Sequence, residues 1–342
     1  MYKVFIRPLL FLLSPEKVHN LVIFLIKIVF RVPGFIAMVK NMYSVRKSEP
    51  FNLLDLKFKN RVGLAAGFDK NASFYREFAA FGFGFIEIGT VTPKGQPGNP
   101  KPRSFRLVAD QALINRMGFN NLGVDSAVER LKNRPEGLII GGNIGKNTNT
   151  PNQEAYKDYV YCFESLYDYV DYFVVNVSCP NISDLRELQD QDMLEGILHR
   201  LDELRASKPV KKPILLKISP DLNFKQVDET LEIVRSCNID GIVATNTSIA
   251  RNNLKSPESL VEEIGKGGLS GSPIRDRSTE MISYIRSKAG INLPIIGVGG
   301  IMSAEDAIEK IKAGADLIQI YTGFIYEGPG FVKKILKEIG SV

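Results

Sequence analysis

The sequence predicts an α/β protein whose main part is a (β/α)8 TIM barrel, preceded by a two-helix membrane-associating extension. Three observations lead to this fold class. A cycle of a short apolar run, a loop rich in Gly, Asn or Ser, and a longer segment of helical periodicity recurs from residue 60 onward. The cycle occurs eight times. The length of 342 residues accommodates such a barrel, which commonly occupies about 250 residues as one domain, together with a short appendage.

The N-terminal extension is predicted to cover residues 1–48, and the barrel domain residues 49–342. Two apolar stretches, at 4–13 and 18–30, flank Ser14-Pro15-Glu16, a combination typical of a helix start. Neither stretch provides the roughly 20 apolar residues that a bilayer-spanning helix needs. We therefore expect two amphipathic helices that lie in the membrane interface.

Two other interpretations of this extension are a secretory signal peptide and a helix pair that only packs on the barrel. A signal peptide is disfavoured because no small-residue cleavage site follows the first apolar run, while Glu16 and Lys17 follow it at once. Charge favours a lipid surface, since residues 1–48 carry eight basic side chains and one acidic side chain. The remaining residues sum to a charge of −1, so no nucleic-acid partner is expected.

The cysteines indicate a reducing compartment. Cys162, Cys179 and Cys237 are few and odd in number, which argues against a disulfide framework. Their spacing is also unlike that of metal ligands. The sequence therefore predicts no metal site.

Eight nearly continuous apolar segments are the predicted barrel strands, as expected of a parallel sheet that is buried on both faces. They are residues 61–66, 84–90, 138–143, 172–178, 213–219, 240–245, 294–298 and 316–321. Polar residues recur at the ends of these segments, where barrel enzymes carry their chemistry. A turn or a helix cap explains any single asparagine there, but it does not explain the recurrence at successive strands.

Glycines in the last two strand-to-helix loops predict a phosphate-bearing cofactor. These loops contain Gly297-Val298-Gly299-Gly300 and Tyr321-Thr322-Gly323, and glycines let backbone N–H groups approach an anion closely. Lys217, at the end of a buried strand, must pair with a carboxylate or face a ligand, because a lone buried ammonium is costly. Two long connections, 91–119 and 246–275, are expected to be functional or to carry small strands.

Several motifs in fixed order then point to one family. They are LAAGFDK (64–70), INRMGFNN (114–121), NVSCPN (176–181), LLKISPD (215–221), ATNTS (244–248), GGLSG (267–271), GVGGI (297–301) and IYTGFIYEGP (320–329). Together they are similar to the dihydroorotate dehydrogenases, and the resemblance covers essentially the whole chain. It implies a flavoprotein that uses FMN to oxidise (S)-dihydroorotate to orotate in de novo pyrimidine biosynthesis.

The resemblance also assigns site residues. The positions that match FMN contacts are Ala66, Thr90, Asn143, Asn176, Lys217, Thr245, Gly271, Gly300, Tyr321 and Thr322. The positions that match contacts to dihydroorotate or orotate are Lys70, Asn115, Arg116, Met117, Gly118, Phe119, Asn176, Asn181, Asn246 and Thr247. The residue types suit these roles, since a lysine can bind the substrate carboxylate and asparagines can pair with an imide edge.

Two features of the sequence favour different electron acceptors. Cys179 matches the catalytic base of the family, but the quinone-reducing branch usually has serine there, and cysteine resembles the soluble branch that uses fumarate or NAD. The N-terminal extension resembles the quinone-reducing branch. In that branch, His19 and Arg106 match the pair that borders the quinone, and Tyr321 lies between this entry and the flavin.

The expected protein is therefore a peripheral membrane enzyme at the cytoplasmic face of the cell membrane, with dihydroorotate and a membrane quinone as partners. A monomer is compatible with the sequence. Two alternatives stay open. One is a dihydroorotate dehydrogenase that uses fumarate or NAD, as Cys179 favours. The other is a catalytically silent barrel that binds a phosphate ligand and attaches to membranes.

Overall fold

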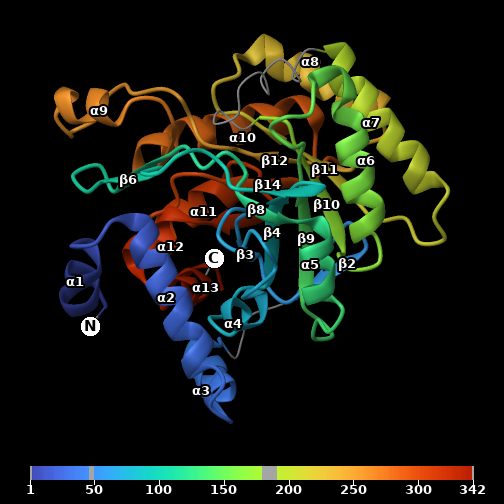
Figure 1. The fold of residues 1–342 in the computed structure, drawn as a ribbon. Helices are drawn as coiled ribbons and strands as arrows, with labels where there is room; N and C mark the ends of the chain where they lie inside the picture. Colours follow the sequence, from blue (N-terminus) through green and yellow to red (C-terminus); the bar gives the residue numbers. More distant parts are fainter. Residues whose placement is uncertain (1, 46–49, 179–190, 341–342) are drawn as a thin grey trace.

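Eight parallel strands form a closed barrel at the centre of the molecule (Figure 1). The computed structural model describes residues 2–45, 50–178 and 191–340. The order around the barrel is β10-β11-β12-β14-β15-β3-β4-β9. The bounds are β3 Val62–Leu64, β4 Phe85–Val91, β9 Ile139–Ile144, β10 Tyr172–Asn176, β11 Ile214–Ile218, β12 Gly241–Ala244, β14 Ile295–Val298 and β15 Leu317–Ile320. Every predicted strand is confirmed, with ends that agree within two residues.

Helices cover the outside of the barrel (Figure 1). They are α4 Tyr75–Ala79, α5 Val124–Leu131, α6 Ala155–Leu166, α7 Gln191–Ala206, α8 Phe224–Ser236, α10 Arg275–Ala289, α11 Ala304–Lys312 and α13 Phe331–Ile339. Two of them begin with a capping box, formed by Asn223 and Gln226 in α8 and by Ser303 and Asp306 in α11. Such boxes provide partners for backbone N–H groups that a helix start leaves unpaired. The predicted (β/α)8 fold is thereby confirmed.

The barrel strands are apolar on both faces because two hydrophobic layers flank them. In β10, Phe173 and Val175 belong to the layer beneath the outer helices, whereas Tyr172 belongs to the layer inside the barrel. A hairpin of β1 (Phe51–Leu53) and β2 (Leu56–Phe58) precedes the barrel. Its Phe58 packs edge-on against Phe85 at 5.2 Å, at the N-terminal ends of the strands, so it closes the end of the barrel opposite the expected site.

The two long connections carry small strands, as expected. In the first, β6 (Ser104–Leu107) pairs with β7 (Ala112–Asn115), and β5 (Lys94–Gln96) pairs with β8 (Asn121–Gly123), which follows just after the predicted end of the connection. The second contributes β13 (Gly268–Gly271), which pairs with β7, and the short helices α9 (Glu258–Ile264) and η4 (Ser272–Ile274). The two connections therefore share a three-stranded antiparallel sheet, β13-β7-β6, above the barrel, and β5 and β8 form a separate two-stranded sheet.

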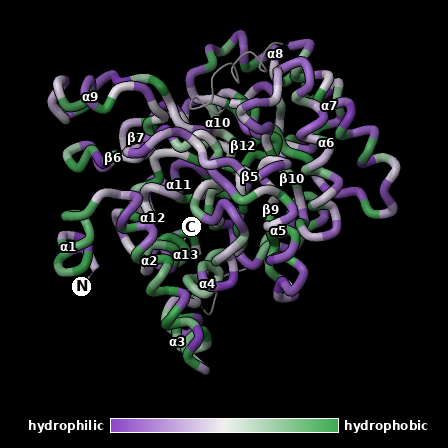
Figure 2. Tube along the Cα trace, in the orientation of Figure 1, coloured by the Kyte–Doolittle hydropathy of each residue, from purple (hydrophilic) through white to green (hydrophobic). Residues whose placement is uncertain are grey.

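The N-terminal extension is helical and contains one helix more than predicted. A π-helical turn, η1 (Tyr2–Ile6), continues into α1 (Arg7–Phe11), and α2 (Pro15–Val29) follows at an angle of 119°. The additional helix, α3 (Phe35–Tyr43), begins after Gly34. Figure 2 shows α1, α2 and α3 as a mainly apolar arm beside the barrel. Among the described helices, none is alone long and apolar enough to span a membrane, although the bent pair η1–α1 and α2 together reaches that length.

Candidate active site

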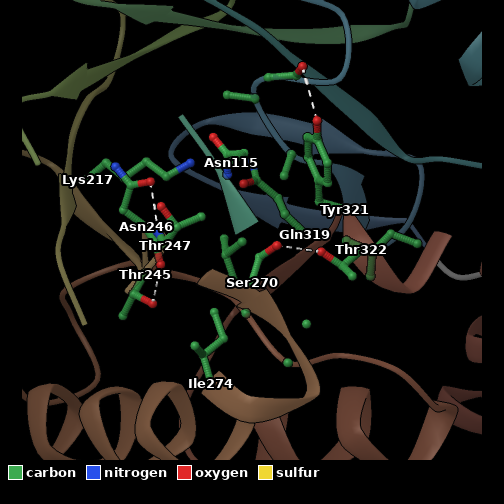
Figure 3. Close-up of a pocket in the computed structure, with 18 of the residues that line it drawn as sticks. Asn115, Lys217, Thr245, Asn246, Thr247, Ser270, Ile274, Gln319, Tyr321 and Thr322 are labelled. Carbon is green, nitrogen blue, oxygen red and sulfur yellow. Dashed lines mark hydrogen bonds between the residues drawn. The ribbon is translucent and has the colours of Figure 1, made fainter. Parts of the chain in front are cut away.

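A cavity lies at the C-terminal ends of the barrel strands, beneath the small antiparallel sheet (Figure 3). The predicted site residues that line it are Ala66, Lys70, Thr90, Asn115, Met117, Gly118, Phe119, Asn176, Lys217, Thr245, Asn246, Thr247, Gly271, Gly300, Tyr321 and Thr322. They come from strands and loops spread over the whole barrel domain. The structure thus brings together most of the residues that the motifs singled out.

Four of the residues predicted to contact FMN or substrate or to act as the base are not among those that line this cavity. Asn143 is completely buried and forms hydrogen bonds with Thr90 and Asn176, which do line the cavity. The Arg116 side chain turns away from the cavity, where it donates to the carbonyl of Lys266 at 3.2 Å and stacks over Phe105 at 4.6 Å. The other two, Cys179 and Asn181, lie outside the described residues.

Hydrogen-bonded side chains form the floor of the cavity. Thr90 Oγ1 donates to Asn143 Oδ1 at 2.5 Å and accepts from Asn176 Nδ2 at 2.9 Å. Asn143 Nδ2 donates to Glu87 Oε1 at 2.8 Å. All four side chains are buried, so each loss of a partner would leave a polar group without water to replace it. This network holds Thr90 and Asn176 in fixed positions against the cavity.

Lys217 both faces the cavity and approaches a carboxylate. Its Nζ lies 3.9 Å from Glu87 Oε1, and the side chain is 7% exposed. The sequence left these two possibilities as alternatives, and the structure combines them. Glu87 itself was missed, although a lone acid inside the apolar run 84–90 is a signal that could have revealed it.

Small residues form one end of the cavity. Gly300 adopts a φ of 73°, and a Cβ there would lie 2.1 Å from the Cα of Arg275, so the loop requires glycine. Ser270 and Thr322 share a hydrogen bond of 2.9 Å across the same end (Figure 3). A backbone that a ligand can approach closely and two hydroxyl groups can together form hydrogen bonds with the oxygens of a phosphate ester. This end therefore fits the phosphate of a nucleotide cofactor.

Amide and cationic side chains gather at the opposite end. Asn246 Nδ2 donates to Asn176 Oδ1 and to Ser178 Oγ, each at 3.2 Å. Lys70 Nζ donates to Asn120 Oδ1 at 2.5 Å, and Lys70 also lines the cavity. A cation next to several amides can bind a carboxylate and an imide edge in one molecule.

His19 connects the N-terminal extension with this cavity. Its ring meets Phe68 edge-on at 5.8 Å, and Phe68 in turn meets Tyr321 at 5.1 Å. Burial of the imidazole against the barrel, together with the charge of Lys70, lowers the pKa of His19 to about 4, although the residue as a whole stays accessible to solvent. The ring is therefore neutral at pH 7. Burial also raises the pKa of Tyr321 to about 12, so its hydroxyl is neutral as well.

Arg106 fastens the turn between α1 and α2 to β6. Its Nη1 donates to the carbonyls of Leu13 at 2.6 Å and Phe11 at 3.3 Å, and its guanidinium lies 4.3 Å from the centre of the Phe11 ring. Nearby, Arg103 forms an ion pair of 2.9 Å with Glu16 of α2. His19 and Arg106 thus both lie where the apolar arm meets the barrel.

Comparisons with known proteins agree with this site. The family model for dihydroorotate dehydrogenase matches residues 50–342. A dihydroorotate dehydrogenase (quinone) from Christiangramia forsetii is 53% identical, with 99% of this chain and 98% of the relative covered. Another from Idiomarina loihiensis is 44% identical, with 98% and 99% covered. The crystal structure of DHODH in complex with ferulenol from Eimeria tenella is similar at a TM-score of 0.82 and 34% identity, covering 95% of this chain and 90% of that chain. The chain therefore belongs to the dihydroorotate dehydrogenase family.

Proposed function

We propose that this protein is a flavoprotein oxidoreductase that converts (S)-dihydroorotate to orotate and passes the electrons to a quinone, in de novo pyrimidine biosynthesis. The observation that carries the proposal is the cavity, which joins a phosphate-binding end to an amide-rich cationic end. Relatives that cover nearly all of this chain are named for the same reaction and acceptor.

The residues that line the cavity suit FMN. Gly300, Ser270 and Thr322 would hold its phosphate, and Lys217 would lie beside the ring system, where a cation favours the electron-rich reduced form. Thr90 and Asn176 offer donors and acceptors on the floor between these ends. When bound, FMN supplies the acceptor for the hydride that leaves the substrate.

Lys70 and the neighbouring asparagines would hold dihydroorotate at the other end. The Lys70 ammonium would bind the carboxylate, and Asn246 would bind the ring amides. Oxidation of the saturated C5–C6 bond removes a proton from one carbon and a hydride from the other, and a double bond forms between them. Cys179, as a thiolate, would accept the proton and later release it to water. A thiol with a pKa near 8.5 is a competent base close to neutral pH.

The start of the loop that carries Cys179 is held by the barrel. Ser178 is buried, and its Oγ donates to the carbonyl of Lys217 at 2.8 Å. Ser178 Oγ also accepts the hydrogen bond from Asn246. The residue before the proposed base is thus tied both to the strand that carries Lys217 and to a proposed substrate contact.

The apolar arm would place the protein on the cytoplasmic face of the cell membrane as a peripheral enzyme. Exposed fractions reach 68% for Val4 and Leu9 and 82% for Leu12, values that leave large apolar side chains in water unless lipid covers them. A quinone that enters between the arm and the barrel would pass His19 and Arg106, and Phe68 and Tyr321 would lie between it and the flavin. Because Glu16 and Leu13 fasten the arm to the barrel, this entry would keep a defined shape.

Anaerobic reduction tests this reaction directly. Dihydroorotate added to the purified protein should bleach the visible flavin absorbance and release one orotate for each flavin. A colourless protein that does not bind added FMN would instead support a catalytically silent phosphate-binding barrel. A yellow protein that dihydroorotate does not bleach would contradict the proposed substrate.

A further inference from the structure

A carboxylate lies inside the barrel, directly beneath the cavity. Glu87 of β4 is completely buried. Its Oε1 accepts from Asn143 Nδ2 at 2.8 Å, and its Oε2 accepts from Gln319 Nε2 at 2.6 Å. Lys217 Nζ is 3.9 Å from Oε1. Two neutral amides and one ammonium therefore surround a charge that has no contact with solvent.

This arrangement connects separate parts of the cavity wall. Asn143, Lys217 and Gln319 belong to three other strands, β9, β11 and β15, and the last two of these residues line the cavity. Figure 3 shows Lys217 and Gln319 approaching the cavity from different strands. A buried ion pair adds little net stability, because the loss of hydration offsets most of the attraction between its charges. Stability alone therefore does not explain why this ion pair lies beneath the cavity.

We propose that Glu87 is a positioning residue that fixes the Lys217 ammonium and partly neutralises it, and thereby sets the reduction potential of the bound flavin. The inference rests on the proposed binding of FMN. An ammonium beside the ring system makes the gain of electrons more favourable, and a nearby carboxylate makes it less favourable. Both charges are shielded from water, so their effects on the flavin are only weakly screened.

The substitution Glu87→Gln isolates the charge. It preserves the size of the side chain and retains one oxygen to accept from Asn143. The new amide nitrogen needs an acceptor, and Gln319 Oε1 accepts no hydrogen bond from the residues that the structure describes. Rotation of the Gln319 amide by half a turn would present that oxygen. The hydrogen-bond network can therefore persist after the negative charge has gone.

Potentiometric titration of the FMN-loaded protein against reference dyes gives the test. Glu87→Gln should shift the equilibrium toward reduced flavin by at least about tenfold, which is about 30 mV more positive for a two-electron couple. The control Glu129→Gln makes the same chemical change on the outer helix α5, where Glu129 is exposed and pairs with Lys132, and should leave the potential unchanged. Should Glu87→Gln fail to fold, Glu87→Asp takes its place, because a carboxylate withdrawn from Lys217 should give a smaller shift in the same direction.

The outcomes separate this inference from the proposed function. A wild-type protein that binds no flavin would overturn both. A wild-type flavoprotein that forms orotate, but whose potential does not respond to either substitution of Glu87, would overturn this inference alone. A shift in both Glu87 variants, with Glu129→Gln like the wild type, would support it, since a purely structural role for Glu87 predicts altered melting without an altered potential.

Discussion

Gly300→Ala should remove FMN binding, because the structure leaves no space for a methyl group at this position. The Cβ would lie 2.1 Å from the Cα of Arg275, and φ is 73°. The backbone of Arg275 cannot easily retreat, since the buried Lys310 Nζ holds its carbonyl at 2.7 Å. The left-handed conformation costs about 1–2 kcal/mol for alanine. Overpacking adds about 1–3 kcal/mol and deforms the loop that would hold the phosphate.

Gly137→Ala is the matched control. Gly137 has a φ of 72°, but among the described residues no atom beyond its two chain neighbours lies within 4 Å of its Cβ position. The free energy of unfolding of Gly137→Ala should fall only by the conformational contribution of about 1–2 kcal/mol, and the variant should keep its flavin. Flavin content after gel filtration and urea unfolding of both variants provide the assay. If Gly300→Ala keeps as much flavin as Gly137→Ala and unfolds at the same urea concentration, the proposed role of this loop is wrong.

Three further predictions address other parts of the molecule. Burial lowers the pKa of Lys310 to about 7, below its value in the unfolded chain. The free energy of unfolding of the wild type should therefore rise by about 2 kcal/mol from pH 7 to pH 9, and urea unfolding of Lys310→Met should show no such rise. Cys179→Ala should retain FMN but form orotate at least about 100-fold more slowly, and near-normal turnover would exclude it as the base. Leu12→Glu should reduce sedimentation with anionic liposomes without changing the melting temperature, and unchanged sedimentation would show that α1 and its exposed end do not contact lipid.

The barrel could be predicted from the sequence because its strands are buried on both faces. Runs such as 172–175 and 213–216 are apolar for that reason up to the polar residue near the strand end, and the cycle of strand and helix gives their number. The hairpin β1–β2 and the helix α3 were missed. The strands of the hairpin have three residues each, too few to show a clear alternation, and α3 has nine residues of which only Val39 is fully buried, so neither stands out from its surroundings in the sequence.

The sequence predicted the positions of the candidate site residues better than the directions of their side chains. Strand ends identify which residues reach the rim, and these include Lys217 and Asn176. Strand ends do not give the direction of a side chain in the loop that follows. Arg116 is an example, since its side chain turns toward backbone carbonyls of the second connection. Glu87 was missed for a different reason, since its partners come from strands far apart in the chain and meet only when the barrel closes.

The choice of electron acceptor is the sharpest test of the proposed function, because Cys179 resembles the soluble branch while the apolar arm resembles the quinone-reducing branch. Orotate formation by the purified, FMN-loaded protein should be measured with a short-tailed quinone, with fumarate and with NAD in turn. We predict turnover with the quinone and little with the other two acceptors. Strong turnover with fumarate or NAD, and none with the quinone, would contradict the proposed function.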